Sequence, residues 1–170
     1  MAKSSSESMK KLCNEIIENA LDPDVEYDYL KSAFDEELPI IYERGLADDF
    51  LLAYEISEAI KEVVVFPEFI GYASSSIVAN LLRITEVNPK EYGLKFKDVM
   101  GDTSKDYMWG YHLSKYYLYD VYKELKTHFQ SVELSANDDY FIVDGLKINI
   151  ETSYDRIQSI GLCMERCKPF

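Results

Sequence analysis

An Asp-Gly pair, Asp144-Gly145, stands between two runs in which apolar and polar residues alternate, Tyr140–Val143 and Leu146–Ile150. A two-residue type I′ turn needs positive φ at both central positions, and Asp followed by Gly tolerates that backbone well. The pattern therefore predicts an antiparallel hairpin. Together with the alternation just before it, it predicts three strands, at 131–135, 140–144 and 146–151.

Apolar residues at helical spacing dominate the first two thirds of the chain. A helix is expected from near Asp24, with a break near Leu38, because Pro39 lacks an N–H and clashes with the preceding turn. Gly45, a residue suited to a C-cap, ends the short helix that follows. The same periodicity predicts further helices at about 48–63, 74–83, 105–129 and 154–167.

The β-branched, apolar run Val63–Phe66 is bounded by Pro67 and predicts a short buried strand. Helices first and a small, mainly antiparallel sheet later make an α+β fold. A chain of 170 residues has the length of one domain. We therefore expect a flexible N-terminus at residues 1–8 and a single domain over residues 9–170.

The charge balance bears on nucleic-acid binding. Lys and Arg number 18 and Asp and Glu number 31, which gives a formal net charge of −13. A DNA-binding domain gains affinity when its Lys and Arg side chains neutralise phosphates and release counterions. An acidic chain of this kind is repelled by nucleic acid at long range, so autonomous DNA binding is not expected.

The composition also bears on location. No run approaches the ~20 apolar residues of a membrane span, and the polar N-terminus lacks the apolar core of a secretory signal. The three cysteines, Cys13, Cys163 and Cys167, are too few and odd in number for a disulfide framework. We expect a cytoplasmic protein in which these cysteines pack rather than bind a metal.

Two blocks of sequence follow the order found in bacterial replicative polymerases. The first is Gly45–Leu51, and the second runs from Ser76 to Phe96 and contains Ile84-Thr85. Together they cover about residues 40–100. On these blocks the chain resembles the palm region of the DNA polymerase III alpha subunit. The resemblance implies that the α+β fold is palm-like, which is a nucleotidyltransferase-like arrangement.

The phosphate-binding loop of that family ends in Gly-Arg-Gly-Ser. Aligned on Ser76, its Arg falls on Ile70, its second Gly on Gly71 and its Ser on Tyr72. Glycines let backbone N–H groups close around a triphosphate, and a helix start behind them favours the negative charge. Two of the three phosphate-facing residues are therefore replaced. The candidates that remain either cap the helix or hold an anion weakly, and they are Gly71, Ser74, Ser75 and Ser76.

The family's catalytic strand carries Pro-Asp-x-Asp-x-Asp, which places three carboxylates on one face of a strand. These carboxylates hold the two cations of phosphoryl transfer. Here the best candidate is Leu146–Glu151, in which Lys147, Asn149 and Glu151 hold the carboxylate positions. Lys brings positive charge to a metal position, and Asn is a neutral ligand for a hard cation.

The vestigial catalytic candidates are thus Asn149, Glu151 and Asp155, which follows the strand. No metal site is expected among them. Mg²⁺ is a cofactor only if an enzyme activity survives.

A Tyr-rich segment extends from Tyr107 to Tyr122, with Lys115 within it. Stacking of single-stranded bases also needs a basic groove, so core packing or a protein interface is the expected role. Tyr is enriched where partners bury surface, which makes this helix a candidate contact for a protein partner or a homo-oligomer. A nucleophile–His–Asp unit is not expected, because the chain has only two histidines, His112 and His128, to serve as its base.

Three functions are compatible with these features. The first is a non-catalytic interaction module that kept a palm-like fold and lost the metal site. The second is a metal-dependent nucleotidyl- or phosphoryl-transfer enzyme with a rearranged site built on Glu151, Asp155 and Asp144. The third is an unrelated α+β binding domain. Loss of both the loop residues and the carboxylates favours the first.

Overall fold

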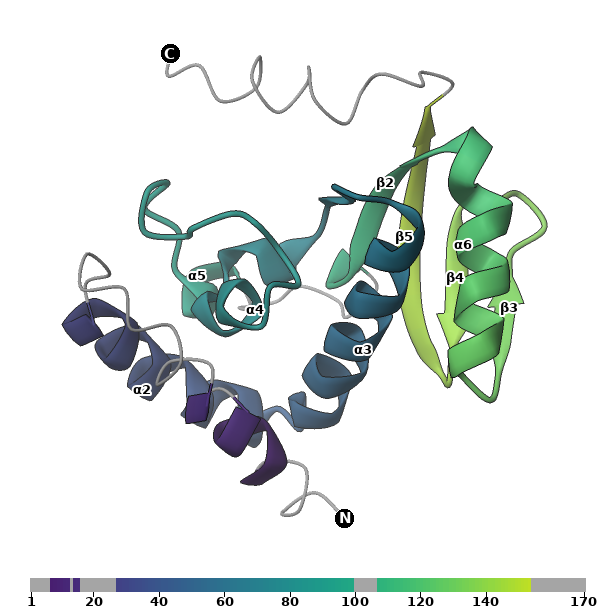
Figure 1. Cartoon of the computed structure of the whole chain (residues 1–170). Coiled ribbons are helices and arrows are strands. Elements are labelled where there is room, and N and C mark those ends of the chain that lie inside the picture. The colour runs from purple at the N-terminus through teal and green to yellow at the C-terminus, as the bar shows by residue number, and fades with distance from the viewer. Residues whose placement is uncertain (1–6, 13, 16–26, 100–106, 154–170) are drawn as a thin grey trace. The chain divides into compact units, whose positions relative to one another are not determined.

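The computed structural model describes residues 7–12, 14–15, 27–99 and 107–153 (Figure 1). It divides into two compact units: Met1–Glu55 with Gly71–Met108, and Ile56–Ile70 with Trp109–Phe170. That residues 9–170 act as one domain, with residues 1–8 flexible, stays a prediction. No helix in the described part of the chain combines the length and apolar character that a membrane crossing needs.

The first unit is helical. Its described elements are α2 (Tyr27–Glu43), the first part of α3 (Ala47–Val63), the 3-10 helix η1 (Tyr72–Ser75), α4 (Ile77–Leu81) and α5 (Phe96–Val99). α2 packs against α4 and α5, and η1 contacts the same two helices. Phe50 of α3 and Phe96 of α5 are both buried and meet edge to face, with ring centroids 6.1 Å apart.

Pro39 lies inside α2, so the predicted break near Leu38 is wrong. A proline in a helix interior removes one main-chain hydrogen bond and costs about 3 kcal/mol. Burial of the flanking Leu38 and Ile41 offsets that cost, while Pro39 itself is exposed. Packing of the apolar face thus decides the course of the helix, and local propensity does not.

Gly45 follows the end of α2, as predicted. It adopts a φ of 64°; its N–H donates to the carbonyl of Tyr42 at 3.1 Å, and the N–H of Leu46 donates to that of Ile41 at 2.9 Å. These two bonds satisfy carbonyls that lack a partner at a helix end. Glycine is favoured here because the left-handed backbone brings no Cβ clash.

The strand predicted at Val63–Phe66 is wrong. α3 continues to Val63, and the chain then bends so that Val65 and Phe66 are 77% and 66% exposed. The strand comes later, at β1 (Glu68–Phe69). β-branched and aromatic residues favour a strand where neighbouring strands pack on them, and in the described part of the chain Val65 and Phe66 pair with no strand.

The second unit contains a five-stranded sheet in the order β1-β2-β5-β4-β3. Its longer strands are β2 (Gly110–Ser114), β3 (Val132–Leu134), β4 (Tyr140–Val143) and β5 (Leu146–Ser153). β2 runs parallel to β5, and the other neighbouring pairs are antiparallel. The predicted α+β fold with a mainly antiparallel sheet is confirmed, and so are the three strands expected in the last third of the chain.

The turn between β4 and β5 is also confirmed. Asp144 and Gly145 adopt φ values of 45° and 92°. The Asp144 Oδ1 accepts a hydrogen bond from the N–H of Ser131 at 2.7 Å, and the N–H of Asp144 donates to the Ser131 carbonyl at 2.8 Å. The turn is therefore tied to the loop that precedes β3.

The helix predicted over 105–129 is wrong in its first part, because Gly110–Ser114 form β2. α6 (Lys115–His128) begins only after Ser114, whose side chain accepts from the N–H of Tyr116. β2 lies between β1 and β5, and its Tyr111 and Leu113 are buried. Pairing with a strand much later in the chain outweighs the local periodicity. The helix predicted at 154–167 lies outside the described residues.

One face of the sheet forms the core of the second unit. Tyr122 of α6 stacks on Phe141 of β4 with ring centroids 6.3 Å apart, and the buried Leu118, Val121 and Leu125 face the same core. At the other end of this face, Phe69 contacts Tyr111 edge to face at 5.4 Å. Burial raises the pKa of the Tyr111 hydroxyl well above its ordinary value.

Candidate functional site

The start of α4 in the first unit is held by a carboxylate from α2. Ser76 is the N-cap; its Oγ accepts from the N–H of Ala79 at 3.2 Å and donates to the Glu37 Oε2 at 2.8 Å. The same carboxylate accepts from the N–H groups of Ile77 at 2.9 Å and Val78 at 3.2 Å. Backbone N–H groups at a helix start are the donors that bind phosphate in other proteins. Here an anion of the chain itself occupies them.

Glu37 is only 8% exposed. Burial raises the pKa of its carboxyl group above the ordinary value, and the negative charge of Glu36 acts in the same direction. The hydrogen bonds from Ile77, Ser76 and Val78 oppose this shift without cancelling it. The carboxyl group is therefore well bonded, yet its ionised form carries a desolvation cost.

The other serine candidates also donate within the chain. The Ser74 Oγ donates to the Gly71 carbonyl, and the Ser75 Oγ donates to the Tyr72 carbonyl, each at 2.7 Å. With Ser76 bonded to Glu37, each of the three serine hydroxyls has an acceptor in its own unit. The sequence-predicted residues of the loop are thus brought together, and their polar groups are used to shape η1 and α4.

Gly71 lies against the chain's own backbone. It adopts a φ of 135°, and a Cβ added to it would lie 2.6 Å from the carbonyl oxygen of Met108. That oxygen accepts the N–H of Ala73 at 3.1 Å. In a phosphate-binding loop, a glycine lets a ligand approach the backbone closely. At Gly71 the missing side chain instead lets the main chain at Met108 approach.

The vestigial catalytic candidates belong to the second unit. Asn149 and Glu151 lie on β5, on the face opposite the buried Ile148 and Ile150. The Asn149 Nδ2 donates to the Trp109 carbonyl at 3.1 Å. Glu151 is exposed. The third candidate, Asp155, lies outside the described residues.

β2 borders β5 on this face, and the helix predicted over 105–129 concealed it. Its residues Gly110, His112 and Ser114 share a face, and they are the register partners of Asn149, Glu151 and Ser153 in β5. Of these six positions only that of Glu151 holds a carboxylate. The alternation of Tyr111 and Leu113 with less apolar neighbours is the signal that could have identified β2.

Side chains on this face already have partners. The His112 Nδ1 lies 3.1 Å from the Glu68 Oε2 of β1, and the Lys147 Nζ lies 4.9 Å from the centroid of the Tyr140 ring. Among the residues that the structure describes, no group of three or more His, Cys, Asp or Glu side chains could hold a metal ion.

Of the three carboxylates in the enzyme hypothesis, the structure describes Asp144 and Glu151, and these two do not converge. Asp144 precedes β5, and Glu151 lies five residues after the first residue of that strand, Leu146. At ~3.3 Å per residue, roughly 17 Å of strand separates them. A cation bound by both would need oxygens within about 2.6 Å of it. Asp144 and Glu151 therefore cannot share an ion.

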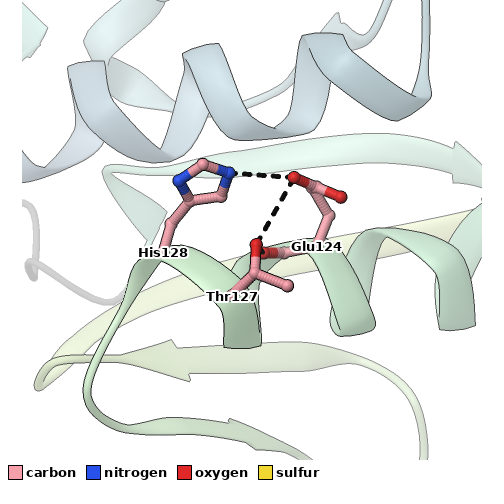
Figure 2. Close-up of polar contacts among 3 residues, drawn as sticks. All are labelled: Glu124, Thr127 and His128. Carbon is pink, nitrogen blue, oxygen red and sulfur yellow. Dashed lines mark hydrogen bonds and ion pairs between the residues drawn. The ribbon is translucent and has the colours of Figure 1, made fainter.

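A polar cluster on α6 combines residue types used in hydrolases (Figure 2). Glu124 Oε1 lies 2.8 Å from His128 Nε2 and 3.5 Å from Thr127 Oγ1. The hydroxyl also donates to the Glu124 carbonyl at 2.7 Å. In a nucleophile–His–Asp unit the imidazole lies between hydroxyl and carboxylate. Here the carboxylate lies between the other two, so the cluster stabilises the last turn of a helix.

Comparison with known proteins identifies the family. The family model of the bacterial DNA polymerase III alpha NTPase domain matches residues 7–107, which is more than half of the 170-residue chain. No curated protein matches the chain. The match spans the α4 start with its serines and ends shortly before β2. The chain therefore belongs to the family of the bacterial DNA polymerase III alpha NTPase domain.

Proposed function

We propose that the chain is a non-catalytic member of this family, which keeps a degenerate palm-like framework and acts as an interaction module. The observation that carries the proposal is the Glu37 carboxylate at the start of α4, bonded to Ser76, Ile77 and Val78. A triphosphate would have to displace a buried carboxylate from these donors. Two anions cannot share them without strong repulsion.

The sheet face that carries Asn149 and Glu151 supports the same proposal independently. Two-metal catalysis needs several carboxylates on one strand face. β2 and β5 offer Gly110, His112 and Ser114 beside Asn149 and Glu151. Glu151, a neutral amide and an imidazole already paired with Glu68 are a weak set of ligands for two hard cations.

The alternative is a metal-dependent nucleotidyl- or phosphoryl-transfer enzyme with a rearranged site. It relies on Glu151 and Asp155, because Asp144 is bonded to Ser131 at the far end of β5. Membership of the polymerase family removes the ground for the third hypothesis, an unrelated binding domain.

The proposed contact surface is the outward side of α6. Leu118, Val121 and Leu125 point into the core, whereas Tyr116 and Tyr119 are 53% and 58% exposed. Tyrosine offers a large contact area with few rotatable bonds, and it is enriched at the centres of interfaces. We propose a protein partner or a second copy of the chain on this side, in the cytoplasm, with no cofactor and without autonomous DNA binding.

Calorimetry of the full chain tests the loss of catalysis. Nucleoside triphosphates are titrated with and without MgCl₂, and we expect no Mg²⁺-dependent heat. Glu37→Ala is titrated in parallel, because it removes the internal anion while leaving the sheet face unchanged. Tight, Mg²⁺-dependent nucleotide binding by the unaltered chain contradicts the proposal and favours the enzyme alternative.

Sedimentation velocity tests the contact surface, beginning with a second copy of the chain. We expect concentration-dependent association that the double variant Tyr116→Ser/Tyr119→Ser abolishes. Tyr92→Ser is the matched control, since Tyr92 is 56% exposed but lies in the first unit. Association that the Tyr92 change removes and the α6 changes leave intact would place the contact elsewhere.

A further inference from the structure

A cavity of about 310 Å³ lies in the first unit, between the second half of α2 and residues 89–97. This volume is at the lower end of the range of about 300–1,000 Å³ for small-molecule sites. Ile40, Pro89, Leu94 and Phe96 give it an apolar wall. Glu37 also lines the cavity, but it directs its carboxylate oxygens to the start of α4.

The wall of the cavity is held in shape by its own hydrogen bonds. The N–H of Leu94 donates to the Pro89 carbonyl at 2.9 Å, and the N–H of Gly93 donates to the Lys90 carbonyl at 3.1 Å. The N–H of Lys90 donates to the Asn88 Oδ1 at 3.1 Å. A wall fixed before binding loses little conformational entropy when a ligand enters.

Positive charge is concentrated around this cavity. Lys90, Lys95 and Lys97 line it, although the chain as a whole has a net charge of −13. Of the two acidic residues in the lining, Glu37 is buried and bonded to three donors of α4. Glu36 is exposed, and the three lysines outnumber the two glutamates of the lining. Cations therefore exceed anions at the rim, above an apolar wall.

We propose that this cavity binds an organic anion in which an apolar or aromatic body carries a carboxylate, phosphate or sulfonate group. The body contacts Leu94, Phe96 and Ile40, and the acidic group lies near Lys95 and Lys97. An apolar pocket with a few charged groups at one end is the general form of a small-molecule site. The proposal does not depend on the loss of catalysis.

Fluorescence titration of the full chain with anilinonaphthalene sulfonate tests it, because this probe joins an aromatic body to an anion. We expect one saturable site. The double variant Lys95→Ala/Lys97→Ala weakens the binding by about fivefold, but leaves binding of the neutral analogue N-phenylnaphthylamine unchanged. Leu94→Asp weakens the binding of both probes. Lys123→Ala, an exposed lysine of α6, is the matched control and has no effect.

Two further measurements make the outcome decisive. In ¹H–¹⁵N spectra, the amides of Gly93 and Leu94 shift on titration with the sulfonate probe. Phenyl phosphate and octanoate are then added as competitors, because they carry the phosphate and the carboxylate group of the proposed ligands. Displacement of the sulfonate probe by either one supports the site. Absence of saturable binding, equal weakening by Lys123→Ala, unmoved amides, or displacement by neither competitor overturns the proposal.

Discussion

The start of α4 and the sheet face that carries Asn149 and Glu151 are the two places where the polymerase resemblance implies a charged site, and they differ in what they offer a ligand. At α4 the donors of an anion site persist, with Ser76, Ile77 and Val78 directed at one carboxylate. On the sheet, β5 carries a single carboxylate, Glu151, beside Asn149 and Lys147. The first place is filled by a carboxylate of the protein and the second is poor in carboxylates, so an anion is opposed at one and a cation is poorly held at the other.

The start of α4 and the loop before it are expected to lose more stability on mutation than the sheet face, and Gly71 in that loop gives the largest effect. Gly71→Ala combines an unfavourable φ of 135° with a Cβ 2.6 Å from the Met108 oxygen. We expect a loss of roughly 3 kcal/mol in the free energy of unfolding, measured with urea. Gly93→Ala is the control, because Gly93 has a φ of 63° and open space around it; its cost is about 1 kcal/mol. Equal losses would show that the loop does not close on Met108.

Glu37 gives the next largest effect. Glu37→Gln places an amide NH₂ among donors that need an acceptor, and we expect a loss of about 2 kcal/mol at pH 7. Glu36→Gln, one residue away on the exposed side of α2, changes stability by less than ~0.5 kcal/mol. Similar losses for both variants would mean that the carboxylate does not hold α4.

The pH dependence sharpens the role of Glu37. Its pKa in the folded chain is raised above the ordinary 4.5, mainly by burial. A raised folded-state pKa contributes stability that is fully present below the unfolded value and is lost as the pH rises through the folded value. The stability advantage of the unaltered chain over Glu37→Gln is thus larger at pH 4 than at pH 7. Urea unfolding of both proteins at the two pH values checks this, and an advantage that grows with pH would contradict it.

The carboxylate-poor face of the sheet gives the smallest effects on stability. Glu151→Gln and Lys147→Ala each change the free energy of unfolding by less than ~0.5 kcal/mol, because the side chains lie on the outer face of β5. Ile150→Ala, on the buried face of the same strand, costs about 3 kcal/mol. Thermal or urea unfolding measures all three. A large loss of unfolding free energy in Glu151→Gln would reveal a structural or metal-binding role. The sheet face would then be as sensitive as the start of α4.

Features that depend on neighbouring residues could be predicted from the sequence. Asp144-Gly145 specifies its turn through backbone preference alone, and Gly45 specifies the end of α2 in the same way. The three strands around the turn follow from alternation on either side of it. Membership of the polymerase family could be recognised from Gly45–Leu51 and the segment after Ser76.

Features that depend on distant partners could not be predicted. Glu37 caps a helix 39 residues later in the chain, and nothing near Glu37 signals that contact. β2 is a strand because β1 and β5 pair with it, whereas its Tyr111 also fits the helical period of the residues that follow. Pro39 stays inside a helix because Leu38 and Ile41 are buried around it. In each case packing outweighs local preference.

The parallel pairing of β2 with β5 sets an order of folding. The β4–β5 hairpin closes across two residues and can form within about 1–10 μs. β2 and β5 are separated in the sequence by α6, β3 and β4. Their pairing therefore forms later, because contacts distant in sequence require loop closure first. The strand next to the end of the family match is therefore expected to join the sheet late, and slow steps in refolding should report on its docking.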